Sequence, residues 1–272
     1  MTYEAFWRPL TQIYETGEAK AVAQLVFEVR YGLTMADVLC GKTGDETELR
    51  HIQERLLQGE PVQYVLGVAE FGERQFLVKP GVLIPRPETY ELCQWCLPAD
   101  TCGWRGRVLD IGTGSGCIAC TLAAALPKAE VTAWDISEAA LSVARENAKR
   151  TNVHVSFEQV DALNPPPITL HWDIIVSNPP YICEQERETM ERNVLEHEPQ
   201  EALFVPDDDP LLFYRAIAGY GQEALKPSGW LYFEINPRYA DDMQHLLSKM
   251  SYHDIEIKKD QFGKQRMIRA QR

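Results

Sequence analysis

Two stretches of the sequence combine residue types that could bind a small molecule and act on it. The first, Asp110-Ile-Gly-Thr-Gly-Ser-Gly116, has glycine at every second position from Gly112 onwards. Glycine lets a backbone turn tightly and approach a ligand, and a helix starting behind such a loop offers free N–H groups. Asp135 follows 19 residues after Gly116, at the end of the next apolar run. Since a carboxylate there can accept hydrogen bonds from both hydroxyls of a ribose, the pattern predicts a site for a nucleoside-containing cofactor.

The spacing of the glycines favours one class of cofactor. In the nicotinamide fingerprint the third glycine stands three positions after the second, whereas Gly116 follows Gly114 by two. With Asp110 directly before the loop, the pattern resembles that of S-adenosylmethionine enzymes, in which the loop meets the methionine end of the cofactor. Asp161, after the third predicted strand, is then placed to approach the adenine amine, unless it is a plain turn aspartate.

The second stretch ends in Asn178-Pro-Pro-Tyr181. Residues 174–176 form a β-branched run, typical of a strand buried on both faces of a parallel sheet. Proline lacks the N–H that a central strand needs and forces the preceding residue to be extended. The strand should therefore end at Asn178, on the sheet edge where ligands of open α/β sheets bind. An ordinary proline turn is the simpler alternative.

The side chains of this stretch suit methyl transfer to nitrogen. An amide or exocyclic amine has two N–H donors and a weakly nucleophilic lone pair. The Asn178 side-chain oxygen and the Pro179 carbonyl could each accept one hydrogen bond, which would orient the nitrogen and raise its electron density. Pro180 fixes the backbone, and the Tyr181 ring can stack on a planar amide or base. A strong general base is not required, because the nitrogen becomes acidic once it is methylated.

Two Cys-x-x-Cys pairs, Cys93/Cys96 and Cys117/Cys120, invite a zinc interpretation. Both pairs fall inside predicted helices rather than in the knuckle turns of zinc sites, so we expect no metal. The seven cysteines have no framework-like spacing, which favours reduced thiols in a cytoplasmic protein.

No apolar run approaches the roughly 18–20 residues that cross a membrane, and no secretory signal is evident at the N-terminus.

The net charge of −13 is unevenly distributed. Residues 1–75 carry 7 basic and 12 acidic side chains, residues 182–209 carry 2 and 10, and the remaining 18 bases and 18 acids cancel. A nucleic-acid-binding surface must neutralise phosphates, so we predict no direct binding of nucleic acid. Acidic flanks suit a basic protein partner, unless they are only solvated faces.

The elements before residue 90 should form a helical domain and a hairpin. Residues 2–60 read as helices, with one apolar face at Val22, Leu25, Val26 and Val29, and with Asp45 as a cap. Pro80-Gly81 between apolar runs at 71–77 and 82–84 predicts a β-hairpin that turns there. We predict a helical domain over residues 1–70, a hairpin linker over 71–88 and a third segment over 89–272.

From residue 105 onwards strands alternate with helices, the signature of a parallel sheet with crossovers. Ser137 stands where a helix N-cap is expected. The expected strands cover residues 108–111, 131–135, 153–160, 173–177, 230–235, 252–258 and 265–270. The expected helices cover residues 88–97, 117–126, 138–150, 210–225 and 240–250. The fold class is therefore α/β, a Rossmann-like domain with a seven-stranded, mostly parallel sheet.

With these motifs assembled, the chain resembles the release factor glutamine methyltransferases (HemK/PrmC type). The likeness covers nearly the whole sequence. The stretches that carry it are the N-terminal helical domain, Gln63-Tyr64-x-x-Gly67 with Phe71, Ile84-Pro-Arg-Pro-Glu-Thr89, Asp110 to Gly116, Asn178 to Tyr181, Glu198-Pro199 with Ala202-Leu203, and Tyr214-Arg-Ala-Ile217. The resemblance implies a class I S-adenosylmethionine-dependent methyltransferase, with S-adenosylhomocysteine as its product. Its substrate would be the glutamine amide nitrogen in the Gly-Gly-Gln motif of peptide chain release factors, in translation termination.

The same resemblance assigns roles to individual residues. It implies catalytic roles for Asn178, Pro179 and Tyr181. It implies cofactor contacts for Gly112, Thr113, Gly114, Ser115, Gly116, Asp135, Ile136, Asp161, Ala162 and Asn178. It implies glutamine contacts for Asn178, Pro179, Pro180 and Tyr181, with Pro85, Arg86, Pro87 and Glu88 along the active site.

The chain departs from the family pattern in three places. Tyr90 stands where the family usually has an acid, Asn236 where it usually has glycine, and residues 205–209 replace a glycine-containing loop.

Two rival functions remain. The Asn178 to Tyr181 motif also occurs in nucleic-acid amino-methyltransferases, which act on the exocyclic amine of adenine or cytosine, and a non-catalytic cofactor-binding module is the other alternative.

Overall fold

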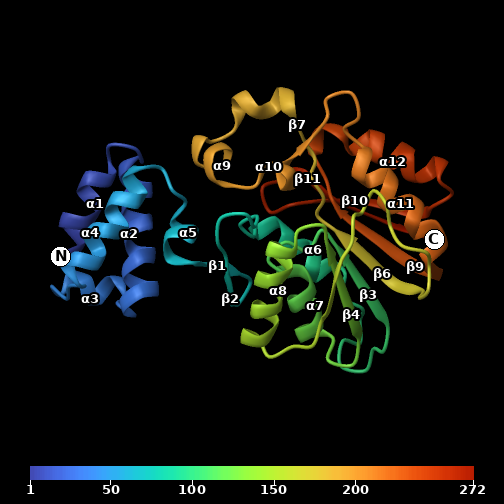
Figure 1. Cartoon of the computed structure of the whole chain (residues 1–272), viewed down its shortest axis with the longest axis horizontal. Helices are drawn as coiled ribbons and strands as arrows, with labels where there is room; N and C mark the ends of the chain where they lie inside the picture. Colours follow the sequence, from blue (N-terminus) through green and yellow to red (C-terminus); the bar gives the residue numbers. More distant parts are fainter. The chain divides into compact units, whose positions relative to one another are not determined.

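The computed structural model describes all of residues 1–272, and the chain forms two compact units (Figure 1). The first unit contains residues 1–68 together with 190–197, and the second contains residues 69–189 together with 198–272. None of the helices combines the length and the apolar character that crossing a membrane requires.

The first unit is helical. Its elements are α1 (Tyr3–Leu10), α2 (Thr16–Tyr31), α3 (Met35–Leu39), α4 (Glu46–Leu57), α5 (Val62–Leu66) and α9 (Arg192–His197). Asp45 caps α4 as predicted, by accepting the Glu48 N–H at 2.8 Å. The four residues of the predicted apolar face of α2 all pack in the helical core, where Val26 is fully buried and Val22, Leu25 and Val29 are partly buried. Ala19 and Ala23 share that face, and their small side chains allow α1 to pack closely against α2.

The predicted hairpin exists, but its predicted turn is wrong. The paired strands are β1 (Val68–Phe71) and β2 (Arg74–Leu77), and the chain turns at Gly72, whose φ is +60°. Pro80-Gly81 does form a turn, yet residues 82–84 are not a strand. The buried Val82 and Ile84 instead belong to an irregular segment that leads to α6 (Pro87–Trp95).

The second unit is built around a seven-stranded sheet in the order β10-β11-β9-β6-β3-β4-β5, with only β11 antiparallel to the other strands. The strands are β3 (Arg107–Ile111), β4 (Glu130–Asp135), β5 (Ser156–Gln159), β6 (Trp172–Ser177), β9 (Leu225–Glu234), β10 (His253–Lys259) and β11 (Gln265–Gln271). This is the predicted sheet, although β5 is shorter than the predicted strand over 153–160. The two-residue strands β7 (Ile182–Cys183) and β8 (Phe204–Val205) pair separately.

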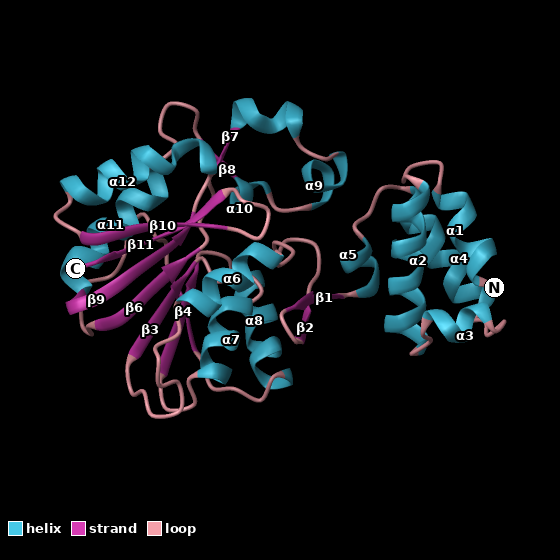
Figure 2. Ribbon diagram, turned by 180° about the vertical axis from the view of Figure 1, so that it is seen from behind, coloured by secondary structure: helices cyan, strands magenta, loops and turns pink.

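Helices cover both faces of the sheet (Figure 2). The helices are α6, α7 (Cys117–Ala125) and α8 (Glu138–Arg150) on one face, and α11 (Leu212–Ala224) and α12 (Ala240–Lys249) on the other. Alternate residues of β3 serve the two layers, because successive strand side chains point to opposite faces. Val108 packs with α7, and Leu109 and Ile111 pack with α11 and α12. Ser137 caps α8 as predicted.

Three shorter helices complete the second unit: η1 (Glu184–Thr189), α10 (Gln200–Leu203) and η2 (Pro237–Tyr239). All seven cysteines are free thiols. Cys93 lies in α6, and Cys117 and Cys120 lie in α7, where burial raises the pKa of both thiols to about 12. No three metal-ligating side chains converge in the structure.

Candidate active site

The glycine loop leaves β3 and enters α7 in a conformation that needs glycine. Gly112, Gly114 and Gly116 have φ of +75°, +54° and +79°, which L side chains rarely adopt. A Cβ at Gly112 or Gly114 would meet no atom within 4 Å, so the backbone there borders open space. A Cβ at Gly116 would lie 2.9 Å from the Ala144 Cβ. The first two glycines therefore face a site, and the third permits close packing of α7 on α8.

Two buried side chains hold this loop from behind. Asn147 of α8 donates to the Ser115 carbonyl at 2.9 Å and also bonds both backbone groups of Leu77 in β2. Asp110 accepts the Thr113 hydroxyl at 2.6 Å and the Ala119 N–H at 3.2 Å. Its second carboxyl oxygen is buried without a partner. Burial raises the pKa of Asp110 to about 7, although the hydrogen bonds from Thr113 and Ala119 act in the opposite direction.

Asp135 and Asp161 are the carboxylates predicted to bind the ribose and the adenine. Asp135 ends β4, and Asp161 follows shortly after β5. Asp135 accepts the Gly114 N–H at 2.8 Å and the Ser137 N–H at 2.9 Å, so it also fixes the glycine loop. Burial raises the pKa of Asp135. Asp161 is half-buried and accepts the Leu163 N–H at 2.9 Å. Each carboxylate keeps free acceptor capacity, because an ionised carboxyl has about four lone-pair sites.

A cavity of about 300 Å³ lies at this edge of the sheet. Its wall includes residues 81–86, 89, 111–115, 135–137, 160–163, 177–180, 199, 201 and 202. The open space beside Gly112 and Gly114 suits the methionine part of S-adenosylmethionine, and the carboxylates Asp135 and Asp161 on the same wall suit its nucleoside part. Arg86, the one cationic side chain on the wall, is already bound to Glu198. The donor set therefore suits this cofactor better than a pyrophosphate-containing one.

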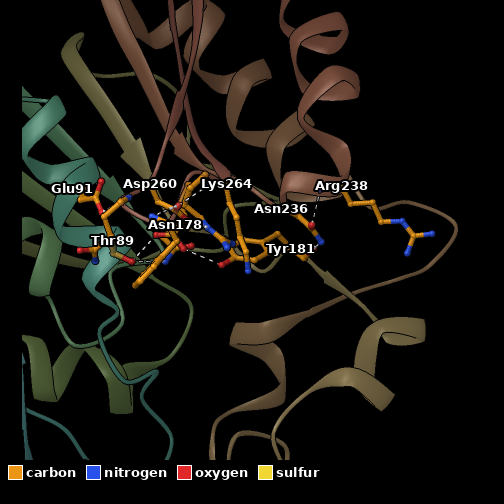
Figure 3. A network of polar contacts seen from close by, with 12 residues as sticks. Thr89, Glu91, Asn178, Tyr181, Asn236, Arg238, Asp260 and Lys264 are labelled. Atoms are coloured by element: carbon orange, nitrogen blue, oxygen red, sulfur yellow. Dashed lines mark hydrogen bonds and ion pairs between the residues drawn. The ribbon is translucent and has the colours of Figure 1, made fainter.

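Asn178 meets this cavity at the end of β6, and its amide is held by a network of side chains (Figure 3). Its Nδ2 donates to the Thr89 hydroxyl oxygen at 3.2 Å. The Thr89 hydroxyl donates to Glu234 Oε2 at 2.6 Å, and the Tyr181 hydroxyl donates to Glu234 Oε1 at 2.9 Å. Glu234 is only 2% exposed, and its burial raises its pKa. The Glu234 carboxylate behind the cavity wall therefore holds both ends of the motif Asn178 to Tyr181, Asn178 through Thr89 and Tyr181 directly.

Glu198 anchors the proline-rich wall of the cavity. Its carboxylate accepts the Ile84 N–H at 3.0 Å and the Arg86 guanidinium at 2.5 Å. Pro85 lies between these two contacts, so its backbone is fixed on the cavity wall.

Most of the predicted site residues come together around this cavity. Nine of the ten predicted cofactor residues line it, as do Pro179, Pro180, Pro85 and Arg86. Gly116, Tyr181, Pro87 and Glu88 do not line it. Gly116 lies against α8, and the Tyr181 hydroxyl is directed to Glu234.

Three residues at the site received no role from the sequence: Thr89, Glu198 and Glu234. For Glu234 a signal was present, since it is the single charged residue in the otherwise apolar run from Trp230 to Ile235. A buried carboxylate is costly unless it is paired, so an acid in a core strand calls for a partner. The sequence does not say which partner.

The departures from the family pattern have structural counterparts. The Asn236 amide donates to the Tyr181 carbonyl at 3.2 Å and to Glu186 Oε2 at 2.9 Å, contacts that glycine could not make. The Tyr90 ring packs edge-on against Phe71, and a Cβ at Gly72 would come within 2.2 Å of it. Asn236 and Tyr90 therefore each form specific contacts at positions where the family usually has a different residue.

Comparison with known proteins identifies the family. The chain is 47% identical over 269 residues to a release factor glutamine methyltransferase of Bacteroides thetaiotaomicron, which covers 97% of this chain and 96% of the relative. A release factor glutamine methyltransferase of Flavobacterium psychrophilum is 38% identical, with coverage of 97% and 96%. This chain belongs to the release factor glutamine methyltransferase family. Family membership confirms the resemblance drawn from the motifs.

Two further comparisons concern the domain type and the fold. The family model described as methyltransferase small domain matches residues 92–203. A crystal structure of a methyltransferase from Pyrococcus furiosus superposes with a TM-score of 0.54 at 17% identity, covering 81% of this chain and 98% of that one. At this identity the likeness concerns the fold alone, and it confirms the Rossmann-like methyltransferase fold.

Proposed function

We propose that this protein transfers a methyl group from S-adenosylmethionine to the side-chain amide nitrogen of the glutamine in the Gly-Gly-Gln motif of peptide chain release factors. The observation that carries this proposal is the place of Asn178. Its amide is fixed by Thr89 on the wall of the same cavity that the glycine loop borders. Near full-length likeness to release factor glutamine methyltransferases supports the choice of substrate.

In this proposal the glycine loop, Asp135, Ile136, Asp161 and Ala162 bind the cofactor. S-adenosylmethionine supplies an electrophilic methyl group on a sulfonium centre. The protein has to position the amide nitrogen and remove water from it, since holding two reactants in line can replace much of the entropic cost of their encounter.

Asn178 and Pro179 perform the positioning. The Asn178 Oδ1 and the Pro179 carbonyl each accept one N–H of the glutamine amide, which directs the nitrogen lone pair and increases its electron density. Pro180 keeps the backbone rigid, and Pro85 and Arg86 form another part of the cavity wall. S-adenosylhomocysteine would be the other product. The methylated nitrogen is acidic and would release its proton to water, so no buried base is needed.

Docking of the release factor involves the acidic segments. Residues 1–70 form the docking domain in this proposal, and the acidic stretch 182–209 attracts a basic partner. A cytoplasmic location belongs to the same proposal, and seven free thiols support it because such thiols persist in a reducing compartment.

The test is transfer of a radiolabelled methyl group to a purified release factor and to its variant with Gln→Ala in the Gly-Gly-Gln motif. We expect label on the first protein and none on the second. Label on both proteins would place the modification at another residue. Label on DNA or RNA, but on neither protein, would favour a nucleic-acid amino-methyltransferase instead.

A further inference from the structure

The carboxylate of Glu234 is a buried acidic group next to the active site. It ends β9 behind the cavity wall, is 2% exposed, and forms no direct ion pair. The nearby Arg266 pairs with Asp260 and acts on Glu234 only through space, where it lowers the pKa of that carboxyl against the larger effect of burial. Ionised groups are rarely buried without a compensating contact, and apolar replacements of similar size are often as stable. Its two contacts are the hydroxyls of Thr89 and Tyr181, which belong to α6 and to the motif after β6. The placement therefore favours a role in ordering those residues.

The chemistry of these groups determines which of them donates and which accepts in each hydrogen bond. An ionised carboxylate can only accept hydrogen bonds, so the single hydroxyl proton of Thr89 is committed to Glu234. The Thr89 oxygen can then only accept, and the group that approaches it must be a donor. Of the two ends of the Asn178 amide, only Nδ2 meets that requirement, and it lies 3.2 Å away. The Oδ1 end is therefore turned away from Thr89.

We propose that Glu234 is a positioning residue that acts through Thr89 to keep the Asn178 Oδ1 available as the acceptor for the methyl-accepting amide. A flipped Asn178 would present its NH2 group to the N–H donors of the substrate. Two donors facing each other cannot form a hydrogen bond. The inference rests on the proposed function for the need of an acceptor at Asn178, whereas the direction of the network rests on the observed contacts and on an ionised Glu234.

The second contact of Glu234 extends the same argument to Tyr181. Its hydroxyl is used by Glu234, so the ring that follows Pro180 is held in one orientation. The backbone at this point has a separate anchor, because the buried Tyr214 hydroxyl donates to the Glu234 carbonyl at 3.0 Å. Tyr214 thus contacts the same residue without touching its carboxylate, which makes Tyr214→Phe a matched control.

The experiment compares Thr89→Val, Thr89→Ser, Glu234→Gln and Tyr214→Phe with the wild type. Valine removes the hydroxyl at nearly constant shape, serine restores it, and glutamine lets the hydrogen bonds run in either direction. We expect Thr89→Val and Glu234→Gln to lower kcat by roughly 10- to 100-fold, with S-adenosylmethionine binding unchanged. We expect Thr89→Ser and Tyr214→Phe to stay within about threefold of the wild type.

A measurement without turnover separates this inference from the proposed function. The side-chain NH2 signal of Asn178, assigned in an 15N–1H spectrum by its loss in Asn178→Ala, should be shifted and protected in wild type and Thr89→Ser. It should move to the position of a free amide in Thr89→Val. An unchanged signal in Thr89→Val, equal losses of kcat in the valine and serine variants, or unchanged kcat in Glu234→Gln would overturn the inference. A wild type that keeps the protected signal but leaves release factors unlabelled would overturn only the proposed function.

Discussion

Arg86 and Glu198 lie 112 positions apart in the sequence, and their side chains form an ion pair of 2.5 Å at the wall of the cavity. The Glu198 side chain is 1% exposed and that of Arg86 is 34% exposed. Glu198 also accepts the Ile84 N–H, so one carboxylate fixes both ends of the segment that contains Pro85. The wall of the site is therefore made by a contact between segments that are distant in the chain.

The first prediction concerns this pair. Arg86→Met should leave the Glu198 carboxylate buried with one backbone partner and lower the free energy of unfolding by about 2–3 kcal/mol. Glu198→Gln should cost less, because it removes the buried charge and keeps an acceptor for Ile84. The double variant should be clearly more stable than the sum of the single changes predicts. Urea denaturation of the four proteins measures this, and strict additivity would mean that the pair is not coupled.

The second prediction concerns Asn178. Asn178→Ala removes the acceptor for the glutamine amide but leaves the glycine loop, Asp135 and Asp161 intact. Turnover should fall by at least about 100-fold, while the Kd for S-adenosylmethionine measured by calorimetry should change little. Turnover equal to the wild type would refute the mechanism. If a normally folded variant no longer bound S-adenosylmethionine, the main role of Asn178 would be cofactor binding.

The third prediction separates two glycines of the loop. At Gly114 a Cβ meets nothing within 4 Å, so Gly114→Ala should cost only the roughly 1–2 kcal/mol of a left-handed residue and should weaken cofactor binding. At Gly116 a Cβ would lie 2.9 Å from the Ala144 Cβ and 3.1 Å from its Cα. Gly116→Ala should therefore destabilise the protein more strongly. Thermal unfolding and cofactor titration distinguish the two effects, and the reverse ranking of the two melting temperatures would contradict this assignment.

The fourth prediction concerns pH and Asp110. Its pKa of about 7 in the folded state lies above the ordinary value of 3.8, so the folded protein holds this proton more tightly than the unfolded chain. Between pH 4 and 7 the unfolded state loses its proton first. The contribution of Asp110 to stability therefore falls as pH rises, by on the order of 4 kcal/mol.

Asp110→Asn keeps an oxygen for the Thr113 hydroxyl and the Ala119 N–H but cannot ionise. It should match the wild type near pH 4 and be more stable near pH 8. Urea titrations at several pH values check this. A variant that is less stable than the wild type at pH 8 would show that the carboxylate contributes more than its burial costs.

The fifth prediction concerns salt. If the acidic stretch attracts the release factor, the KM for that substrate should rise as sodium chloride increases, because ions screen the exposed charges. Glu188→Gln and Asp208→Asn remove exposed acids that form no ion pair, and each should reduce the salt dependence. Glu223→Gln, an exposed acid in the last turns of α11, is the matched control. A KM that does not respond to salt would mean that these acids are only solvated.

The sequence alone determined the parts of the site that depend on local backbone chemistry. The alternate glycines from Gly112 to Gly116 and the two prolines after Asn178 restrict φ and hydrogen bonding within a few residues, so they predict a loop and a strand end wherever they occur. The alternation of strands and helices then brings those ends to one edge of the sheet. For the same reason the caps Asp45 and Ser137 were predictable.

The tertiary structure decided everything that depends on partners distant in the chain. The Pro80-Gly81 signal was a true turn but not the hairpin turn, because pairing of β1 with β2 is settled by which strand lies opposite. Glu234 could be recognised as an unusual acid, yet Thr89 and Tyr181 lie 145 and 53 positions away from it. Such contacts follow from how helices pack on the sheet. A sequence pattern can indicate that a buried acid needs a partner, but it does not indicate which residue that partner is. The chain thus specifies its cofactor loop locally and orders its Asn178 amide only once it is folded.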